Sequence, residues 1–327
     1  RSILSDLSGL SINDTTRAHT ARIIFGSNRN AKEQFVYTDL SEMFPGYKYE
    51  SGKSTYRGFL VGEGGFVYSE PGIYEDVVVL DVASMHPTSI EELNLFGPYT
   101  EKFSDLKRAR IAIKHKDYAS AKAMWGGALA PYLKDEKNAK DLSEALKIVI
   151  NSVYGLTSAS FENPFLDRRN VDNIVAKRGA LFMIDLKHEV EDRGFNVIHI
   201  KTDSIKISKP TPEIIDFIKS FGESYGYTFE VEDTFSRFCL ADKANYVALT
   251  TDGHWKAVGS LFKEPYVFKT LFTHQDVHFE DLCQTKAVKS AIYLDLNEME
   301  DDDDIHHYQF IGRVGVFCPV VPGVGGG

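Results

Sequence analysis

The chain has 327 residues, of which 43% are hydrophobic and 26% are charged, and its formal net charge is −10. This composition is that of a globular protein, and no stretch approaches the ~18 uninterrupted apolar residues that a membrane-spanning helix needs. The three cysteines form neither a CxxC pair nor a zinc-binding spacing, which favours a reducing compartment such as the cytoplasm. Because the chain begins at Arg1 and ends in PGVGGG, we expect it to be a fragment of a longer protein.

The charge is unevenly distributed along the chain. Between Lys102 and Lys140 there are ten Lys or Arg residues against four acidic residues. The segment NEMEDDDD, residues 297–304, is almost purely acidic. We interpret this acidic run as a solvated loop rather than a metal site. The negative total therefore argues only weakly against a nucleic-acid partner.

The first recognisable elements are strands. Residues 1–55 have no decisive pattern. Aromatic residues alternate with glycines over 56–74, which predicts strands joined by tight turns. The run EDVVVLDV, residues 75–82, is typical of a buried strand, yet it carries a carboxylate, Asp81, near its end.

Two helical segments follow the strand. The first is predicted from residue 104 to the residue before Gly126, and the second from about residue 136 to 154. A loop that contains Pro131 separates them. We expect an αα-hairpin inserted between elements of a sheet.

The remaining pattern alternates helices and strands. A long amphipathic helix is predicted over 171–194, with Gly194 as its C-terminal cap. A strand, a short turn and a second strand are predicted over 196–208, then a helix over 211–225 and strands over 228–250. The last seventy-odd residues form a separate mixed region. The predicted fold class is α+β with a mainly antiparallel sheet.

Asp81 and Asp203 are the candidate chemical centre. Taken singly, Asp81 could cap a helix and Asp203 could be an ordinary residue of a hairpin turn. Taken together, one carboxylate ends a buried strand and the other lies in the turn of a neighbouring hairpin. Converging carboxylates repel each other unless a proton or a cation intervenes, and oxygen ligands suit Mg²⁺. With a basic helical pair in the sequence between them, the pattern predicts metal-assisted phosphoryl or nucleotidyl transfer.

Four motifs in order carry a family resemblance. They are DVASMHPTSI at 81–90, KIVINSVYG at 147–155, HIKTDS at 199–204 and KANY at 243–246. The sequence resembles the polymerase region of the family B DNA polymerases, in the bacteriophage branch, whose motifs are D-x-x-S-L-Y-P-S-I, K-x-x-x-N-S-x-Y-G, Y-G-D-T-D-S and K-K-x-Y. The resemblance covers residue 55 to the end. KIVINSVYG is its most specific part, whereas TDS alone would mean little.

The resemblance implies a polymerase right hand. Its antiparallel palm sheet would carry an inserted helical-hairpin fingers subdomain and be followed by a partial thumb. The implied boundaries are an N-terminal segment at 1–55, the palm at 56–100 and 156–250, the fingers at 101–155 and the partial thumb at 251–327.

The resemblance also implies the metal ligands. Asp81, Asp203 and the backbone carbonyl of Val82 would hold two Mg²⁺ ions, for which Mn²⁺ can substitute. The ions would sit ~3.5–4 Å apart, one activating the primer 3′-hydroxyl and one clamping the triphosphate.

Nucleotide-binding roles are implied for the helical pair and the first motif. Lys147, Asn151 and Tyr154 share one helix face, which would cover the incoming nucleotide. Arg110 and Lys114 match basic positions that contact the triphosphate, although a basic surface helix is more often simply solvated. The backbone amides of the first motif would line the triphosphate and the sugar. These residues are Ser84, Met85 and His86.

DNA-binding roles are implied in three places. Lys243 and Tyr246 would hold the primer strand. Without the rest of the motif, Lys243 could equally be an ordinary exposed lysine. Gly64 and Gly65 resemble a glycine-rich segment near the template strand, with turn glycines as the alternative. Thr202 belongs to the third motif and is assigned to DNA contact with it.

The sequence departs from the family motifs at two positions. Lys201 stands where the first aspartate of the third motif is expected, while the aspartate that the family needs as metal ligand is retained as Asp203. His86 replaces the tyrosine that excludes ribonucleotides, so we expect weaker discrimination against them.

The predicted function is template-directed DNA polymerisation by two-metal-ion catalysis, replicating phage DNA in the host cytoplasm. The expected partners are primer-template DNA, dNTPs and replication accessory proteins, with no membrane partner. One alternative is a catalytically incomplete DNA-binding fragment of such a polymerase. A metal-dependent nuclease ranks last, because it has no use for the KIVINSVYG motif. No exonuclease motif is found within residues 1–55, so we expect this chain to lack 3′–5′ exonuclease activity.

Overall fold

The computed structural model describes residues 1–296 and 307–319. The acidic segment 297–304, predicted as a solvated loop, lies outside the described residues. No helix in the described part of the chain is long and apolar enough to cross a membrane.

The chain divides into two compact units. The second unit comprises residues 71–74 and 235–327. The first comprises residues 1–70 and 75–234, and it contains both candidate carboxylates and the helical pair.

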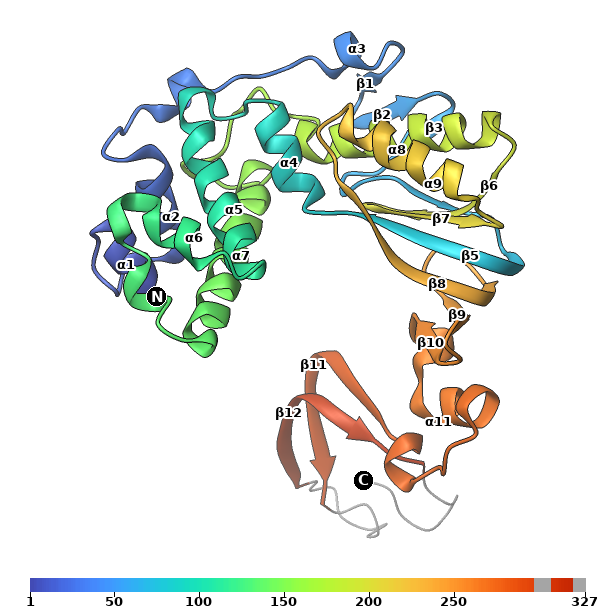
Figure 1. The fold of residues 1–327 in the computed structure, drawn as a ribbon. Helices are drawn as coiled ribbons and strands as arrows, with labels where there is room; N and C mark the ends of the chain where they lie inside the picture. Colours follow the sequence, from blue (N-terminus) through green and yellow to red (C-terminus); the bar gives the residue numbers. More distant parts are fainter. Residues whose placement is uncertain (297–306, 320–327) are drawn as a thin grey trace. The chain divides into compact units, whose positions relative to one another are not determined.

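An antiparallel sheet is the framework of the first unit (Figure 1). Five strands of this sheet follow the order β8-β5-β7-β6-β4. The predicted hairpin over 196–208 is confirmed as β6 and β7, and the α+β class with an antiparallel sheet is confirmed as well. The strands are β4 (Val67–Ser69), β5 (Gly72–Val82), β6 (Asn196–Lys201), β7 (Ser204–Ser208) and β8 (Phe229–Leu240).

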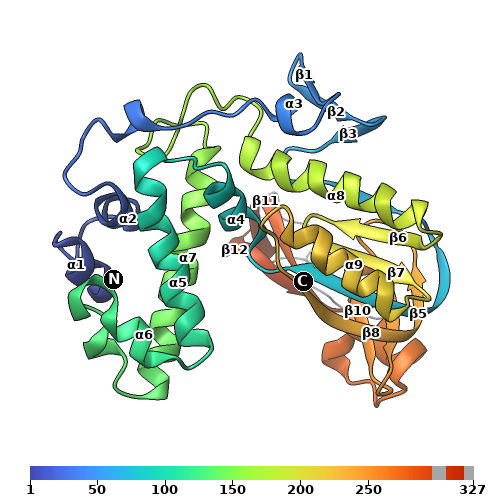
Figure 2. The same cartoon turned by 45° about the horizontal axis from the view of Figure 1, so that its top comes forward.

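One face of the sheet belongs to the main hydrophobic core and is covered by two helices. Val78, Leu80 and Val82 of β5 belong to the main hydrophobic core. Helices α8 (Ile174–Asp192) and α9 (Pro212–Glu223) cover this face (Figure 2). Because side chains alternate along a strand, Val79 and Asp81 point to the opposite face. The core therefore fixes which face of the sheet presents Asp81.

The inserted helices differ from the prediction in one respect. The sequence predicted one helix from residue 104 to 125, but the chain turns at residues 115–117, where Lys116 has a φ of 60°. Asp117 then accepts a hydrogen bond from the amide of Ser120, which starts a new helix. The helices here are α4 (Met85–Glu92), α5 (Thr100–Lys114), α6 (Tyr118–Ala123) and α7 (Glu136–Thr157), with 3₁₀ turns at Gly97–Tyr99, Met124–Gly127 and Ala130–Tyr132.

Residues 1–55, unassigned by the sequence, form small elements, and the strands predicted over 56–74 are confirmed by β3 and β4. A three-stranded sheet of order β1-β2-β3 precedes the glycine-rich segment, in which Gly62 and Gly65 form an isolated bridge. The elements are α1 (Ser2–Ser8), α2 (Thr16–Phe25), a 3₁₀ turn at Ala31–Gln34, α3 (Leu40–Met43), β1 (Lys48–Glu50), β2 (Lys53–Tyr56) and β3 (Phe59–Val61).

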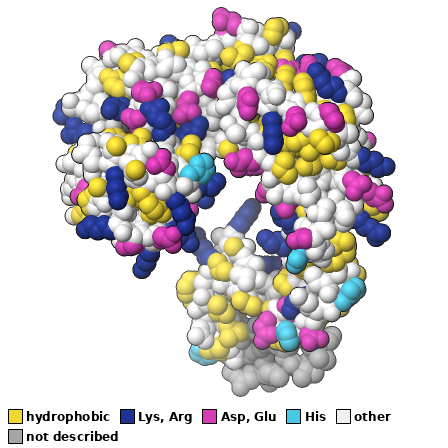
Figure 3. Space-filling view, viewed as in Figure 1, with side chains coloured by type: hydrophobic (Ala, Val, Ile, Leu, Met, Phe, Trp, Pro, Cys, Tyr) yellow, Lys and Arg dark blue, Asp and Glu magenta, His cyan; other side chains and the backbone are white. Residues whose placement is uncertain are grey.

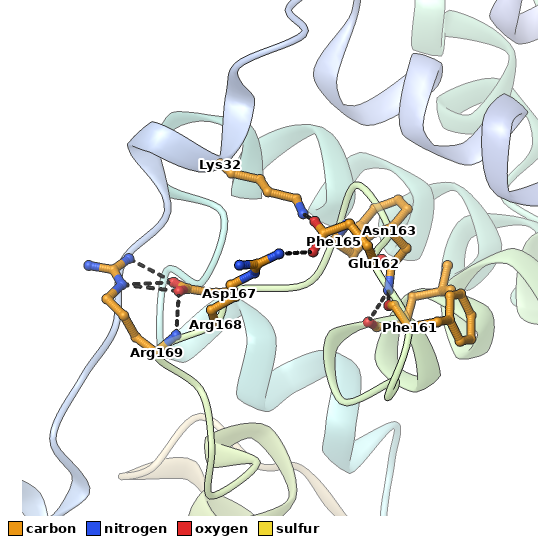
Figure 4. A network of polar contacts seen from close by, with 9 residues as sticks. Lys32, Phe161, Glu162, Asn163, Phe165, Asp167, Arg168 and Arg169 are labelled. Atoms are coloured by element: carbon orange, nitrogen blue, oxygen red, sulfur yellow. Dashed lines mark hydrogen bonds and ion pairs between the residues drawn. The ribbon is translucent and has the colours of Figure 1, made fainter.

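The segment between α7 and α8 is tied down by polar contacts (Figure 4). The buried side chain of Asn163 donates to the carbonyl of Leu156 near the end of α7 and accepts from the amide of Phe165. Lys32 and Arg168 both pair with Glu162. Exposed ion pairs contribute little free energy, so the buried Asn163 contacts are what hold the C-terminal end of α7 in place.

The second unit contains the rest of β8 and the C-terminal elements. Strands β8 and β9 confirm the prediction of strands over 228–250, and β9 pairs with β10. A separate hairpin is formed by β11 and β12. The elements are β9 (Tyr246–Thr250), β10 (Trp255–Val258), α10 (Ser260–Lys263), α11 (Pro265–Phe268), a π turn at Lys269–Thr273, a 3₁₀ turn at Phe279–Leu282, β11 (Gln284–Asp295) and β12 (Tyr308–Phe317).

Candidate active site

Asp81 and Asp203 converge at one end of the sheet. Asp81 lies opposite Ser204 in the β5–β7 pairing, so it neighbours the residue that follows Asp203. The amide of Val82 donates a hydrogen bond of 2.8 Å to the carbonyl oxygen of Asp203. The two predicted catalytic residues are therefore joined through the backbone of adjacent strands.

A strained turn presents Asp203. The turn between β6 and β7 has only two residues, and the first of them, Thr202, has a φ of 57°. A threonine in this conformation costs free energy, which the surrounding contacts must offset. The Thr202 amide donates to the carbonyl of Phe66 at 2.9 Å, and the Asp203 amide donates to the carbonyl of Lys201 at 2.8 Å. These contacts hold the Asp203 backbone in one geometry.

The surroundings of Asp81 and Asp203 disfavour the state in which both carboxylates are ionised with no cation between them. Burial, followed by the nearby charges of Asp203 and Glu232, raises the pKa of Asp81 to about 7, and Lys206 opposes the shift. Burial also raises the pKa of Asp203. Removing the charge repulsion requires a proton or a cation.

The donor set fits a divalent cation of the Mg²⁺ class. The groups at this point are carboxylate and backbone oxygens, which Mg²⁺ prefers. Among the residues that the structure describes, no cluster of three or more His, Cys, Asp or Glu side chains could enclose a metal ion. Two carboxylates alone would leave coordination positions for water or substrate oxygens. The metal itself and the role of the Val82 carbonyl stay predictions.

The first motif turns directly from strand into helix. The Ala83 amide donates to the carbonyl of Thr228 at 2.9 Å, and Ser84 follows with a φ of 55° at the N-terminus of α4. The side chain of Met85 is buried, and its sulfur lies 2.6 Å from where a Cβ on Gly179 would be. Ser84 is exposed, so its backbone and hydroxyl group can face a ligand. The nucleotide contact of the Met85 backbone stays a prediction.

His86 and Tyr154 are brought together from two separate motifs. Their rings stack with centroids 4.0 Å apart and planes 11° from parallel, which joins α4 to α7. Burial lowers the pKa of His86, so the imidazole is neutral near pH 7. Its Nδ1 is buried without a hydrogen-bond partner. An unsatisfied buried nitrogen is uncommon, and it makes His86 a candidate for ligand contact.

The predicted nucleotide-binding residues of the helical pair separate into two groups. Lys147 and Asn151 are exposed on α7, and the nearest carboxylate oxygen to the Lys147 ammonium is on Glu144, 3.9 Å away. Arg110 and Lys114 instead line a hollow of about 330 Å³ between α5 and α7. In Figure 3, Lys and Arg side chains are interspersed with acidic ones over the surface of this helical region. The predicted phosphate-binding cations therefore lie in two places, Lys147 on the exposed face of α7 and Arg110 with Lys114 in the hollow between α5 and α7.

The predicted DNA-binding residues occupy different surroundings. Gly65 has a φ of 140°, and a Cβ placed there would lie 3.0 Å from the methyl group of Thr202. Gly64 lines a cavity of about 560 Å³ together with Tyr154. In the second unit, Lys243 is exposed, whereas Tyr246 is buried and stacks on Phe238 at 4.7 Å. Their DNA contacts stay predictions.

Three charged residues near the carboxylates escaped the sequence analysis. Glu230 and Glu232 of β8 both raise the pKa of Asp81, and Lys206 of β7 lowers it. The alternation of acids in FEVED was a usable signal, because it places both glutamates on one face of a strand. Nothing in the sequence marked Lys206 as buried.

The relatives found by comparison with known proteins are DNA polymerases. No family model matches the chain. The chain is 25% identical over 281 residues to DNA polymerase 2 of Aeropyrum pernix, covering 78% of this chain and 33% of that protein. It is 33% identical over 159 residues to DNA polymerase II of Escherichia coli, covering 43% and 19%, respectively. It is 26% identical over 212 residues to a DNA polymerase of Archaeoglobus fulgidus, covering 58% and 27%.

A solved structure shows the fold. The family B DNA polymerase of Pyrobaculum calidifontis superposes with a TM-score of 0.52 at 17% identity, covering 99% of this chain and 48% of that one. The chain thus has the fold of part of a family B DNA polymerase, and its sequence relatives are DNA polymerases. It spans a third or less of the length of these curated relatives.

Proposed function

We propose that this chain carries the nucleotidyl-transfer centre of a DNA-directed DNA polymerase, acting on dNTPs and primer-template DNA. The observation that carries the proposal is the convergence of Asp81 and Asp203 through the Val82–Asp203 hydrogen bond. The relatives named DNA polymerase support it. We also propose that the protein is of bacteriophage origin. It would act in the cytoplasm of the host together with accessory replication proteins.

The carboxylates would act as metal ligands. Asp81, Asp203 and the Val82 carbonyl would hold Mg²⁺, or Mn²⁺ in its place. When bound, the metal supplies activation of the primer 3′-hydroxyl and neutralisation of phosphate charge. The protein's own contribution is to hold two desolvated carboxylates at fixed positions on adjacent strands, so that little reorganisation is needed during reaction.

The nucleotide would be held by residues from three elements. Exposed Lys147 reaches phosphate oxygens as a point charge, and Arg110 has a fork suited to bidentate contact. The main chain of Ser84 at the start of α4 faces the same ligand. The stacked rings of His86 and Tyr154 provide a flat wall beside the sugar and base. Asn151 and Lys114 complete the proposed nucleotide-binding set.

DNA contacts are proposed for the glycine-rich segment of the first unit and, separately, for Lys243 of the second unit. Gly64 and Gly65 leave room for close backbone approach near Thr202, and Lys243 supplies a sequence-independent phosphate contact. The subdomains proposed with this function are an N-terminal segment at 1–55, a palm at 56–100 and 156–250, fingers at 101–155 and a partial thumb at 251–327.

A second candidate is a DNA-binding fragment that cannot catalyse transfer. The chain spans a third or less of the length of its curated relatives. The two candidates differ in one assay. A labelled primer is annealed to templates that differ only in the first unpaired base, and each dNTP is supplied singly with Mg²⁺. A polymerase adds only the complementary nucleotide. Gel retention of the DNA without any addition would favour the binding fragment, and shortening of the primer without dNTPs would indicate a nuclease.

A further inference from the structure

Lys206 is a buried cation on the sheet face that carries the carboxylates. It lies opposite Val79 of β5, two residues along β7 from Ser204, which lies opposite Asp81. Directly opposite residues of an antiparallel pair share a face, so Lys206 and Asp81 point to the same side of the sheet. Lys206 is only 4% exposed. Its charge is therefore less screened by water and salt than the charge of a surface lysine.

His199 holds the Lys206 ammonium in place. The Lys206 Nζ lies 3.1 Å from the His199 Nδ1, and the two residues are opposite each other in the β6–β7 pairing. An ammonium has donors only, so Nδ1 accepts this hydrogen bond. His199 is 1% exposed. The contact thus holds the Lys206 ammonium at a fixed position beside the imidazole ring.

Lys206 lies close to both carboxylates in the sheet. It is two residues along β7 from the residue opposite Asp81, and three residues along the chain from Asp203. The neighbouring strand β8 carries Glu230 and Glu232 on the other side of β5. At the position where a further acid is expected in the family motif, this chain has Lys201, which is exposed and lies opposite Ser204. The centre therefore combines its acids with a buried cation.

We infer that Lys206, fixed by His199, is a positioning charge that weakens binding of a divalent cation alone and favours its binding together with a polyanionic nucleotide. By Coulomb's law a fixed positive charge repels a divalent cation and attracts a triphosphate. The site then prefers the cation and nucleotide as a pair over the cation by itself. This inference rests on the proposed function, because it takes Asp81 and Asp203 as the cation ligands.

The test is binding of Mn²⁺ alone, measured from the electron paramagnetic resonance signal of free Mn²⁺ at constant pH and ionic strength. The neutral variants Lys206→Met and Lys206→Gln should bind Mn²⁺ about tenfold more tightly than wild type, the order expected for removing one poorly screened charge nearby. Lys206→Arg keeps the charge and should match wild type. Lys209→Met removes an exposed lysine of the same region and serves as the matched control. Adding a dNTP should increase Mn²⁺ affinity more in wild type than in Lys206→Met.

The outcomes separate this inference from the proposed function. Unchanged or weaker Mn²⁺ binding in both neutral variants would overturn the role of Lys206. Equal tightening in Lys206→Arg would assign the effect to packing rather than charge. The Gln side chain of Lys206→Gln can still donate a hydrogen bond to His199. If Lys206→Met does not fold, the Mn²⁺ affinity of Lys206→Gln is compared with that of wild type instead. If Asp203→Asn leaves wild-type Mn²⁺ affinity unchanged, the metal site itself is wrong, and with it the proposed function.

Discussion

The amide of Val82 donates to the carbonyl of Asp203 at 2.8 Å, and this contact joins the strand that carries Asp81 to the turn that carries Asp203. Strand β5 is anchored by Val78, Leu80 and Val82 in the core. Asp81, between the last two of these, is therefore held rigidly on the opposite face. Partial burial of its carboxylate is the physical cost of that rigidity, and it leads to the first prediction.

Replacing Asp81 by Asn should stabilise the metal-free protein at high pH. Because the folded-state pKa of Asp81 is raised to about 7, the folded state binds a proton more tightly than the unfolded state does. Wild-type stability should therefore fall as pH rises from about 4 to 7, and stay low above that range. After allowance for its partial exposure, the effect is about 1–2 kcal/mol.

Thermal unfolding in a chelator at pH 4, 6 and 8 checks this prediction. The Tm of Asp81→Asn should exceed that of wild type at pH 8, and the difference should shrink toward pH 4. Asp216→Asn, an exposed site on α9, should show no such trend. A constant difference across the pH range would contradict the assigned pKa.

Gly65 and Gly64 form a natural pair for testing backbone strain. Gly65→Ala should lower the free energy of unfolding by about 1–3 kcal/mol, because its φ of 140° excludes most side chains and the new Cβ would strike Thr202. Gly64 has neither a positive φ nor an atom within 4 Å of the added Cβ. Gly64→Ala should therefore stay within about 0.5 kcal/mol of wild type in denaturant unfolding. Equal losses in both variants would contradict the geometry of this segment.

Lys147 should contribute to binding of the incoming triphosphate. Loss of one charge-assisted contact is worth about 1.5–3 kcal/mol, so Lys147→Ala should raise the KM for dNTP at least tenfold with a smaller change in kcat. Lys137→Ala, also exposed on α7 but nearly three turns away, is the matched control. Single-nucleotide incorporation over a range of dNTP concentrations measures both. A similar KM for the two variants would remove Lys147 from the site.

His86 should set the discrimination between deoxyribonucleotides and ribonucleotides. Imidazole is smaller than the phenol ring expected here, so the stack on Tyr154 leaves more room beside the sugar. His86→Tyr should increase the preference for dCTP over CTP about tenfold, which is the order of discrimination that one steric contact in a pocket provides. Single-turnover incorporation on one template compares the two nucleotides. Equal selectivity in wild type and His86→Tyr would show that this position does not read the sugar.

Strong local patterns in the sequence predicted the frame of the site. The apolar run ending at Asp81 and the hairpin around Asp203 were predicted because strand alternation and turn chemistry are local signals. The break at Lys116 was missed, because a left-handed residue other than glycine has no strong signature in sequence. The stack of His86 on Tyr154 joins residues 68 positions apart and required tertiary structure. Lys206 lies in a predicted strand with no local signal of burial, and only the packed fold shows that it is buried.

The most direct test of the central claim is primer extension by Asp203→Asn beside wild type and Asp216→Asn. All three proteins receive the same labelled primer-template, dNTPs and Mg²⁺, and binding of the DNA is measured separately. The account predicts template-directed extension by wild type and Asp216→Asn. It predicts at least a thousandfold loss in Asp203→Asn, on the order expected when a metal-binding group is removed, with DNA binding retained. Extension by Asp203→Asn at the wild-type rate would contradict the assignment of Asp81 and Asp203 as the catalytic pair.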